Sequence, residues 1–296
     1  MNRNQGRPGL DSSEDDFQIE DASPPIPAVM GTPEPAEGAP AFNWATPTEM
    51  VALPSGGKFY PPGHPLHDEP TIEIRYMTAK EEDILTSRAL LKKGVAIDRM
   101  LQNIIIDKSI NINDMLVGDK NALIVAARVT GYGPEYDTKV GCPSCGETTE
   151  YSFSLDEDRF VDMEAGLEKN NVVLTEHGTL LITLPTSKVT VETRMLRGSD
   201  ELKLAKEAER KAKKKLDEAT LTDQFRAYII SVNGDTSAFA IASFVQAMPA
   251  RDSRYLRQSY SQCIPNIDLK QHFECSECSY VAEMEVPLTA DFFWPR

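Results

Sequence analysis

Two short stretches decide how this chain is organised: VGCPSCGET at 140–148 and FECSECSYV at 273–281. Each places two cysteines around two intervening residues, Cys142 with Cys145 and Cys275 with Cys278. They could be two redox pairs, disulfide partners, or two halves of one site that folding assembles. The residues on both sides of each pair have strand character, so each stretch predicts a hairpin with its cysteines at the turn.

Composition and charge limit the possible classes of protein. The 296 residues suffice for one large or two ordinary domains, and the net charge of −15 argues against a protein that coats nucleic acid. No apolar run approaches the ~18 residues of a membrane span, and no charged-then-apolar signal pattern opens the chain. We expect a soluble, non-secreted protein without a membrane role. In that setting paired cysteines indicate a metal more often than a disulfide.

The first segment, 1–45, predicts a disordered, acidic, proline-rich tail. Its first 40 residues hold eight Asp and Glu against two Arg, with little apolar periodicity. Such a composition buries too little apolar surface to offset the entropy lost on ordering. Either the tail is simply solvated, or short apolar islets such as IPAVM at 26–30 are available to a partner.

A first module is expected at 46–161. Strands are predicted at TEMVALPS (48–55) and TIEIRYM (71–77), on either side of a Gly/Pro-rich loop. Thr78 and Glu81 form a capping-box pattern that opens a helix reaching about Leu91. A second helix carries Ile97, Leu101, Ile104 and Ile105 on one side, and Asp119 can cap a third before the first cysteine hairpin.

The same order of elements recurs at 172–296, after a linker at 162–171. GTLLITLPTS (178–187) resembles the first strand, VTVETRML (189–196) resembles the second, and Ser199 can cap the next helix. Helical patterns at DQFRAYIISV (223–232) and SRYLRQSYS (253–261) follow. Asp119 precedes Cys142 by 23 residues, and Asp252 precedes Cys275 by 23. We infer an internal duplication and an α+β fold: two modules of short antiparallel strands and helices, each ending in a CxxC knuckle.

The duplication favours one shared site for the four paired cysteines. A structural zinc ribbon needs two such knuckles around one tetrahedral ion, and packing about a pseudo-twofold axis would bring the hairpins together. The separation exceeds the ~15–20 residues of a compact ribbon, which weakens the motif taken alone. Disulfides and redox chemistry remain alternatives, although a thioredoxin-like CxxC would open a helix. We therefore predict one structural Zn²⁺ per chain, bound by Cys142, Cys145, Cys275 and Cys278.

Two neighbouring residues have simpler interpretations. His272 could serve as a ligand only if it displaced a thiol, so a surface histidine is favoured. Cys263 has no counterpart in the first module and is expected in the core.

No catalytic motif is apparent. The sequence lacks GxSxG, P-loop, GxGxxG and HExxH patterns, and a Cys₄ zinc has no open position for a substrate. A non-enzymatic protein follows. RKAKKK at 210–215 predicts either a solvated helix face or a docking site for an acidic partner.

The loop LPSGGKFYPPG at 53–63 is a candidate contact site. Gly56 and Gly57 permit unusual backbone angles, while Phe59 and Tyr60 supply apolar area with a polar tip. The loop either faces a partner or packs the modules together. Alternatively, both aromatic side chains only cover the core of their own module.

VALPSGGKFYPPG (51–63), IEIRYMTAKEEDIL (72–85) and the cysteine hairpin together resemble the baseplate hub and hub-assembly proteins of T4-like contractile-tailed phages. The resemblance covers about Val51 to Phe160 best; the second module is similar through its hairpin and its LPT strand end. It implies a non-enzymatic protein that builds or bridges the baseplate, with other baseplate or tail proteins as partners. The expected location is the virion tail baseplate, or the host cytoplasm during assembly.

A zinc-ribbon adaptor in transcription or another nucleic-acid process is the alternative. The acidic balance and the lack of a basic-aromatic face count against it. Such an adaptor would bind nonspecific DNA with an affinity that falls steeply with salt, whereas a baseplate protein would not.

Overall fold

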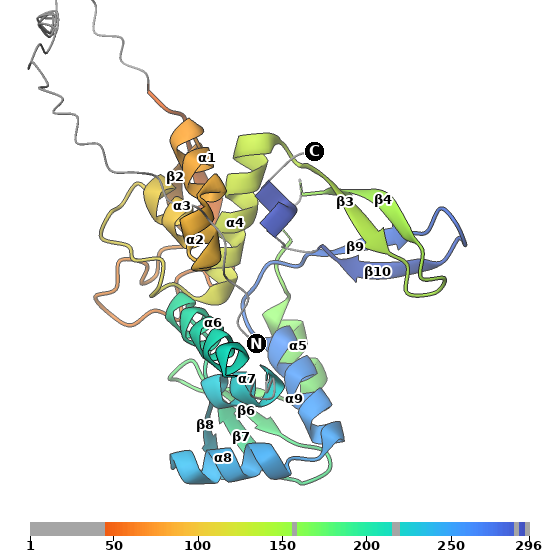
Figure 1. The fold of residues 1–296 in the computed structure, drawn as a ribbon. Helices are drawn as coiled ribbons and strands as arrows, with labels where there is room; N and C mark the ends of the chain where they lie inside the picture. The colour runs from red at the N-terminus through yellow and green to blue at the C-terminus, as the bar shows by residue number, and fades with distance from the viewer. Residues whose placement is uncertain (1–44, 156–158, 215–219, 287–289, 294–296) are drawn as a thin grey trace, which may run out of the picture. The chain divides into compact units, whose positions relative to one another are not determined.

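The structure is a computed structural model that describes residues 45–155, 159–214, 220–286 and 290–293 (Figure 1). Residues from Thr46 onward group into one unit. The expected disorder of the acidic tail falls outside the described residues, apart from Ala45. The described fold is mixed α and β with short antiparallel strands, as the sequence predicts.

The segment predicted as the first module, 46–161, begins with a two-stranded ribbon. Strand β1 (Thr48–Ala52) pairs antiparallel with β2 (Thr71–Arg75), and the inward-facing Val51, Ile72 and Ile74 are buried. After α3, the chain returns to this ribbon, where Ile105 forms a bridge to Ile74. The helices are α1 (Ala79–Thr86), α2 (Arg88–Lys92), α3 (Ala96–Ile104) and α4 (Val117–Tyr132).

The capping box of α1 is confirmed, but the helix is shorter than expected. The Glu81 carboxylate accepts hydrogen bonds from the Thr78 backbone N–H at 3.0 Å and from its hydroxyl at 2.7 Å. Ser87 has extended backbone angles and ends α1, and the backbone N–H of Leu91 then donates to the carbonyl of Ser87 as a new helix begins. The single helix expected up to Leu91 is therefore two helices, α1 and α2.

The segment predicted as the second module, 172–296, contains a four-stranded antiparallel sheet in the order β5-β6-β7-β8. The helix expected at 223–232 ends at Tyr228, and the β-branched residues that follow it form β8, which pairs with β7. The expected linker, 162–171, contains α5, which packs on α9. The elements are α5 (Met163–Asn170), β5 (Val173–Leu174), β6 (Leu180–Thr183), β7 (Thr190–Thr193), α6 (Gly198–Lys213), α7 (Thr220–Tyr228), β8 (Ile229–Val232), α8 (Ala238–Ala247) and α9 (Ala250–Cys263).

Neither helix cap expected from Asp119 or Ser199 forms as predicted. Helix α4 begins two residues before Asp119, whose carboxylate turns instead to the loop after β1 and accepts hydrogen bonds from Ser55. Helix α6 begins at Gly198, and the Asp200 carboxylate accepts from the backbone N–H of Arg197 at 3.1 Å.

Two pairs of carboxylates nevertheless occupy matching positions in the two modules. Glu81 forms an ion pair with Arg75, and Asp200 forms one with Arg194, at 2.6 and 2.7 Å. Like Asp119, the buried Asp252 binds the loop after a strand, through the backbone N–H groups of Thr186 and Ser187, both at 2.8 Å.

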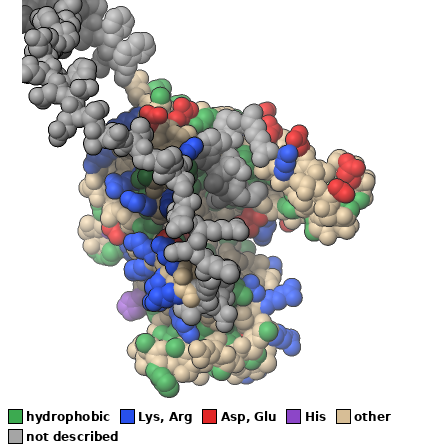
Figure 2. All heavy atoms as spheres, in the orientation of Figure 1, with side chains coloured by type: hydrophobic (Ala, Val, Ile, Leu, Met, Phe, Trp, Pro, Cys, Tyr) green, Lys and Arg blue, Asp and Glu red, His purple; other side chains and the backbone are tan. Residues whose placement is uncertain are grey.

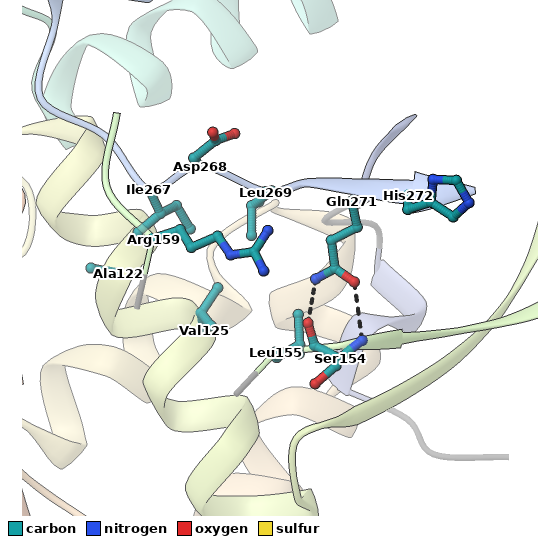
Figure 3. A pocket seen from close by; sticks show the side chains of 10 residues that line it. All are labelled: Ala122, Val125, Ser154, Leu155, Arg159, Ile267, Asp268, Leu269, Gln271 and His272. Atoms are coloured by element: carbon teal, nitrogen blue, oxygen red, sulfur yellow. Dashed lines mark hydrogen bonds between the residues drawn. The ribbon is translucent and has the colours of Figure 1, made fainter. Parts of the chain in front are cut away.

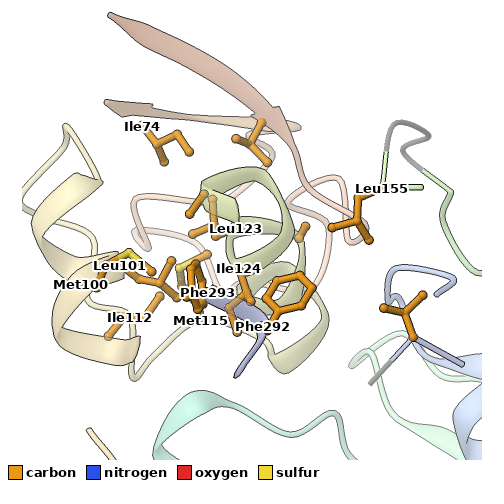
Figure 4. Packing of buried hydrophobic residues seen from close by; sticks show 14 of the residues in the cluster. Ile74, Met100, Leu101, Ile112, Met115, Leu123, Ile124, Leu155, Phe292 and Phe293 are labelled. Carbon is orange, nitrogen blue, oxygen red and sulfur yellow. The ribbon is translucent and has the colours of Figure 1, made fainter. Parts of the chain in front are cut away.

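The buried apolar residues form two clusters. The first is built around α3, α4 and the β1–β2 ribbon, and Phe292 and Phe293 of the 3₁₀ turn η1 (Ala290–Phe293) fill it beside Met115 and Ile124 (Figure 4). The second lies between β6, β7, α7 and α9. The turn η1 therefore belongs to the first cluster, where the buried Arg128 donates to the Phe292 carbonyl at 2.9 Å.

A backbone crossing joins the modules. The N–H of Val117 donates to Leu196, and the N–H of Gly198 donates to Met115, both at 3.0 Å. Beside the crossing, the buried Lys120 ammonium contacts Asp98 at 2.6 Å and Glu201 at 2.9 Å. One cation thus connects α3, α4 and α6.

Candidate metal centre

Each paired cysteine lies at the turn of a β-hairpin. The first hairpin is β3 (Glu135–Gly141) with β4 (Thr148–Ser154), and the second is β9 (Lys270–Glu274) with β10 (Val281–Glu285). The hairpins lie side by side (Figure 1), with the ring of Tyr151 against those of Phe153 and Phe273. The Tyr151 hydroxyl also donates to the carbonyl of His272 at 2.7 Å. Aromatic packing therefore holds the two turns near each other.

The two turns share one backbone geometry. In the first, the N–H of Cys142 donates to Glu147 at 2.8 Å, and the N–H of Gly146 donates to Cys142 at 2.9 Å. In the second, Cys275 donates to Tyr280 and Ser279 donates to Cys275, both at 2.9 Å. Gly146 and Ser279 both have positive φ, at 79° and 54°. This left-handed residue reverses the chain one position after the second cysteine of each pair.

The four sulfur atoms form a compact group drawn from both hairpins. Cys142 Sγ lies 3.7 Å from Cys278 Sγ, Cys145 Sγ lies 3.8 Å from Cys275 Sγ, and all four lie within 4.8 Å of one another. Zn–S bonds of about 2.3 Å in a tetrahedron place neighbouring sulfurs about 3.8 Å apart. The donor set and its spacing therefore fit one tetrahedral thiolate-bound ion such as Zn²⁺.

The sulfur atoms influence one another's ionisation. Desolvation acts to raise the pKa of Cys142, but backbone N–H groups of Cys145 and Ser144 outweigh it and lower the pKa to about 7. A backbone hydrogen bond involving Glu147 acts to lower the pKa of Cys145, but desolvation and the neighbouring cysteine sulfurs raise it to about 12. A dication among four thiolates would offset this mutual repulsion.

All five cysteines are free thiols, and the four predicted ligands are the four that meet. Cys263 is fully buried in the second apolar cluster, away from this group. His272 is exposed and takes no part in the cluster. The cross-hairpin sulfur pairs were not evident from either CxxC pattern; the matching positions in the two modules were the signal.

The structure places the two aromatic loop residues differently. Tyr60 is 2% exposed, and its hydroxyl donates to Asp119 at 2.7 Å and accepts from the Leu116 N–H at 3.0 Å. Desolvation and the Asp119 carboxylate raise the pKa of Tyr60 well above its usual value. Phe59 is half-buried and lies against Gly178 of the second module. Their role in binding a partner stays a prediction.

A cavity of about 270 Å³ lies at the base of the hairpins, between α4, the end of β4 and the approach to β9 (Figure 3). The Gln271 side chain spans it by accepting from the Ser154 N–H at 3.1 Å and donating to the Ser154 carbonyl. The ring of His272 lies away from Ser154. An amide side chain therefore bridges the described part of this cavity.

Within the part of the chain that the structure describes, no helix combines the length and the apolar composition needed to cross a membrane.

Comparison with known proteins identifies the family. Neither the curated proteins nor the solved structures yield a match to this chain. A family model described as T4 bacteriophage base plate protein matches residues 46–294, which include both hairpins and all four clustered cysteines. This match spans most of the chain and agrees with the resemblance in the loop after β1: the chain belongs to the T4 bacteriophage base plate protein family.

Proposed function

We propose that this chain is a structural or assembly protein of the hub region of a contractile-tailed phage baseplate, and that it is not an enzyme. The family match and the closed donor set of four thiolates support this role, because such a set leaves no position for a substrate. Its partners are other baseplate or tail proteins. It acts in the virion tail, in the host cytoplasm during assembly, or in both.

The single observation that carries the metal assignment is the meeting of four sulfurs from two hairpins, although 129 residues separate Cys145 from Cys275 in the sequence. One Zn²⁺ bound by Cys142, Cys145, Cys275 and Cys278 would fix the hairpins to each other. The ion is structural: it holds the ends of two modules, 46–161 and 172–296.

We also propose that the modules arose by internal duplication. Both contain a strand pair whose connecting loop binds a buried aspartate. Both pair an arginine at the end of the second strand with a carboxylate at the start of the next helix, and both end in the same knuckle. A common origin accounts for this agreement in order and spacing. The segment 162–171 links the two copies, and the acidic segment 1–45 precedes them.

Metal analysis tests the zinc centre. Protein purified under reducing conditions should contain about one zinc per chain. Cys142→Ser and Cys275→Ser should release the metal and destabilise the protein, whereas Cys263→Ser should leave the zinc content unchanged. Native protein that is free of metal and carries a Cys142–Cys145 disulfide would contradict the assignment.

Locating the chain in a map of the virion tail, together with its co-purifying proteins from infected cells, tests the hub role. Density at the baseplate centre supports it. A position only at the baseplate periphery, or no association with baseplate proteins at any stage, would contradict it.

A further inference from the structure

A basic surface lies on α2 and the C-terminal half of α6, in a chain whose net charge is −15. None of the residues of α2 is buried, although the helix carries two leucines. We call this region the α2/α6 surface. Its exposed cations are Arg88, Lys92, Lys93, Lys206, Arg210, Lys213 and Lys214.

The two helices present these charges to one another and to solvent. Lys213 pairs with Glu209 at 2.7 Å and lowers the pKa of that carboxyl, and the charge of Lys92 on α2 lowers it further. Lys206 and Lys213 lie three and four residues from Glu209, so they share its face of α6. Lys and Arg side chains gather over α2 and α6 in Figure 2. The charges therefore form one surface rather than isolated points.

The local balance of charge is positive. Residues 88–93 and 198–214 hold nine Lys and Arg against four Asp and Glu, which gives +5. All four acidic residues already have cationic partners. Asp200 pairs with Arg194 and Lys203, and Glu201 pairs with Lys120. Glu207 pairs with Arg210, and Glu209 pairs with Lys213. In contrast, Arg88, Lys92, Lys93 and Lys206 form no ion pair with any residue that the structure describes. No carboxylate among the described residues therefore neutralises these four cations.

We propose that the α2/α6 surface binds an acidic segment of another baseplate protein. Charge complementarity selects the partner, and Leu91, which is 41% exposed and precedes Lys92 in α2, offers an apolar contact beside the cations. Outside residues 88–93 and 198–214 the chain carries a net charge of −20, because the whole chain carries −15 and these two stretches carry +5. A long DNA duplex would extend beyond the surface and be repelled by this negative charge, whereas a short acidic protein segment could bind within the surface.

This inference rests on the proposed structural role, because it supplies that role with a docking surface. A labelled poly-glutamate peptide, followed by fluorescence anisotropy with the full chain, tests it. The test variant is Arg88→Glu/Lys92→Glu/Lys206→Glu. The control, Arg251→Glu/Arg254→Glu/Arg257→Glu on α9, reverses three other exposed arginines and changes the net charge equally.

The wild-type chain should bind the peptide, and added salt should weaken binding. The test variant should lose at least about tenfold in affinity, while the control should stay within about twofold. If the triple reversal fails to fold, Lys92→Gln/Lys206→Gln should show a smaller loss in the same direction. No binding by the wild type, equal losses in both triple variants, or tighter binding of a DNA duplex than of the peptide would overturn the inference. Zinc content and location in the virion are measured by separate experiments. The proposed function can therefore be correct even if the α2/α6 surface does not bind the peptide.

Discussion

Glu81 shows how one side chain can define a helix start and stabilise the fold at the same time. Its carboxylate binds the Thr78 backbone and hydroxyl, and it accepts two hydrogen bonds from the Arg75 guanidinium at 2.6 and 2.8 Å. Burial acts to raise its pKa, but these donors outweigh burial and lower it from 4.5 to about 2. Asp200 repeats the arrangement with Arg194, and its pKa is also lowered.

The sign of the pH dependence follows from that shift. A carboxyl with a lowered pKa stabilises the folded state fully above its unfolded pKa of 4.5, and this contribution is lost as the pH falls toward 2. It is worth up to about 3 kcal/mol for Glu81. Glu81→Gln should therefore destabilise the protein near neutral pH and differ little from wild type at about pH 2.5. Urea unfolding across this pH range measures the difference, and a constant gap at every pH would contradict the assignment.

The two aromatic loop residues should respond differently to substitution. Phe59→Ala removes a half-buried ring that packs against Gly178 and should cost about 1–2 kcal/mol of unfolding free energy. Tyr60→Phe leaves the Leu116 N–H and one Asp119 contact unsatisfied and should cost about 1–3 kcal/mol. Phe239→Ala is the control, because its ring is 83% exposed and the change should stay within about 0.5 kcal/mol. Unchanged stability together with unchanged baseplate assembly for Phe59→Ala would count against both roles of the loop.

At this scale the sequence predicted residue types and positions better than it predicted contacts. Asp119 and Asp252 were recognisable as a matched pair, yet not as ligands of the loops after β1 and β6. A first-turn aspartate is normally interpreted as a cap. Here the donors come from Ser55 and Tyr60, 64 and 59 residues earlier in the chain, and no local pattern reports them.

Helices α4 and α5 each approach another segment at a glycine. A methyl group on Gly118 would lie 2.0 Å from the Pro265 carbonyl oxygen, and one on Gly166 would lie 1.9 Å from that of Gln262. Neither distance is compatible with a side chain, so both glycines set how close the helix can come to its neighbour. These approaches fix α4 against the segment leading to β9, and α5 against α9.

Gly118→Ala should therefore destabilise the protein by about 1–3 kcal/mol, because the backbone it meets has to move. At an ordinary position inside a helix, replacing glycine with alanine would instead stabilise the protein by about 0.5–1 kcal/mol. Gly141→Ala in β3 is the matched control, since its added methyl group meets nothing within 4 Å and should not destabilise the protein. Thermal unfolding separates the cases, and a stabilised Gly118→Ala would refute the close approach.

Elements with a clear period were predictable, whereas short elements that depend on distant partners were not. The strand pairs and cysteine hairpins follow from alternation and turn residues. Strand β8 was interpreted as the end of a helix because Ile229–Val232 continues the apolar pattern of α7, and only pairing with β7 decides its conformation. The four residues of η1 likewise show no pattern that would predict their packing in the first apolar cluster.

At the scale of the whole molecule, the acidic segment should be separable from the folded unit. Deleting residues 2–42 should leave the melting temperature nearly unchanged, because the segment has little apolar surface to bury. Differential scanning calorimetry of the two chains makes the comparison. A large loss of cooperative unfolding would show that the segment packs on the fold. Loss of baseplate assembly with stability intact would make it a recruitment arm.

Zinc and the backbone crossing should hold different parts of the molecule. The proposed ion would join the hairpins, and closing so long a loop would stabilise the folded state appreciably. The crossing near Val117 and Gly198, with its Lys120 ion pairs, joins the modules through contacts that involve no cysteine. Metal loss should therefore loosen the two hairpins against each other, while the crossing keeps the two parts of the chain together.

Chelation of the metal under reducing conditions should lower the melting temperature and loosen the hairpins while the modules stay joined. Hydrogen exchange should rise at 135–154 and 270–285, because without the ion no bond holds the four crowded thiols of the two hairpins together. Exchange at 112–117 and 196–199 should stay slow, since that crossing keeps its backbone hydrogen bonds.

Lys120→Met provides the reverse case. It should lower the free energy of unfolding by about 2–4 kcal/mol because Asp98 loses its cation, yet the protein should retain its zinc. If chelation exposed the crossing as much as the hairpins, the metal would be the main connection between the modules, and the separate role of the crossing would be wrong.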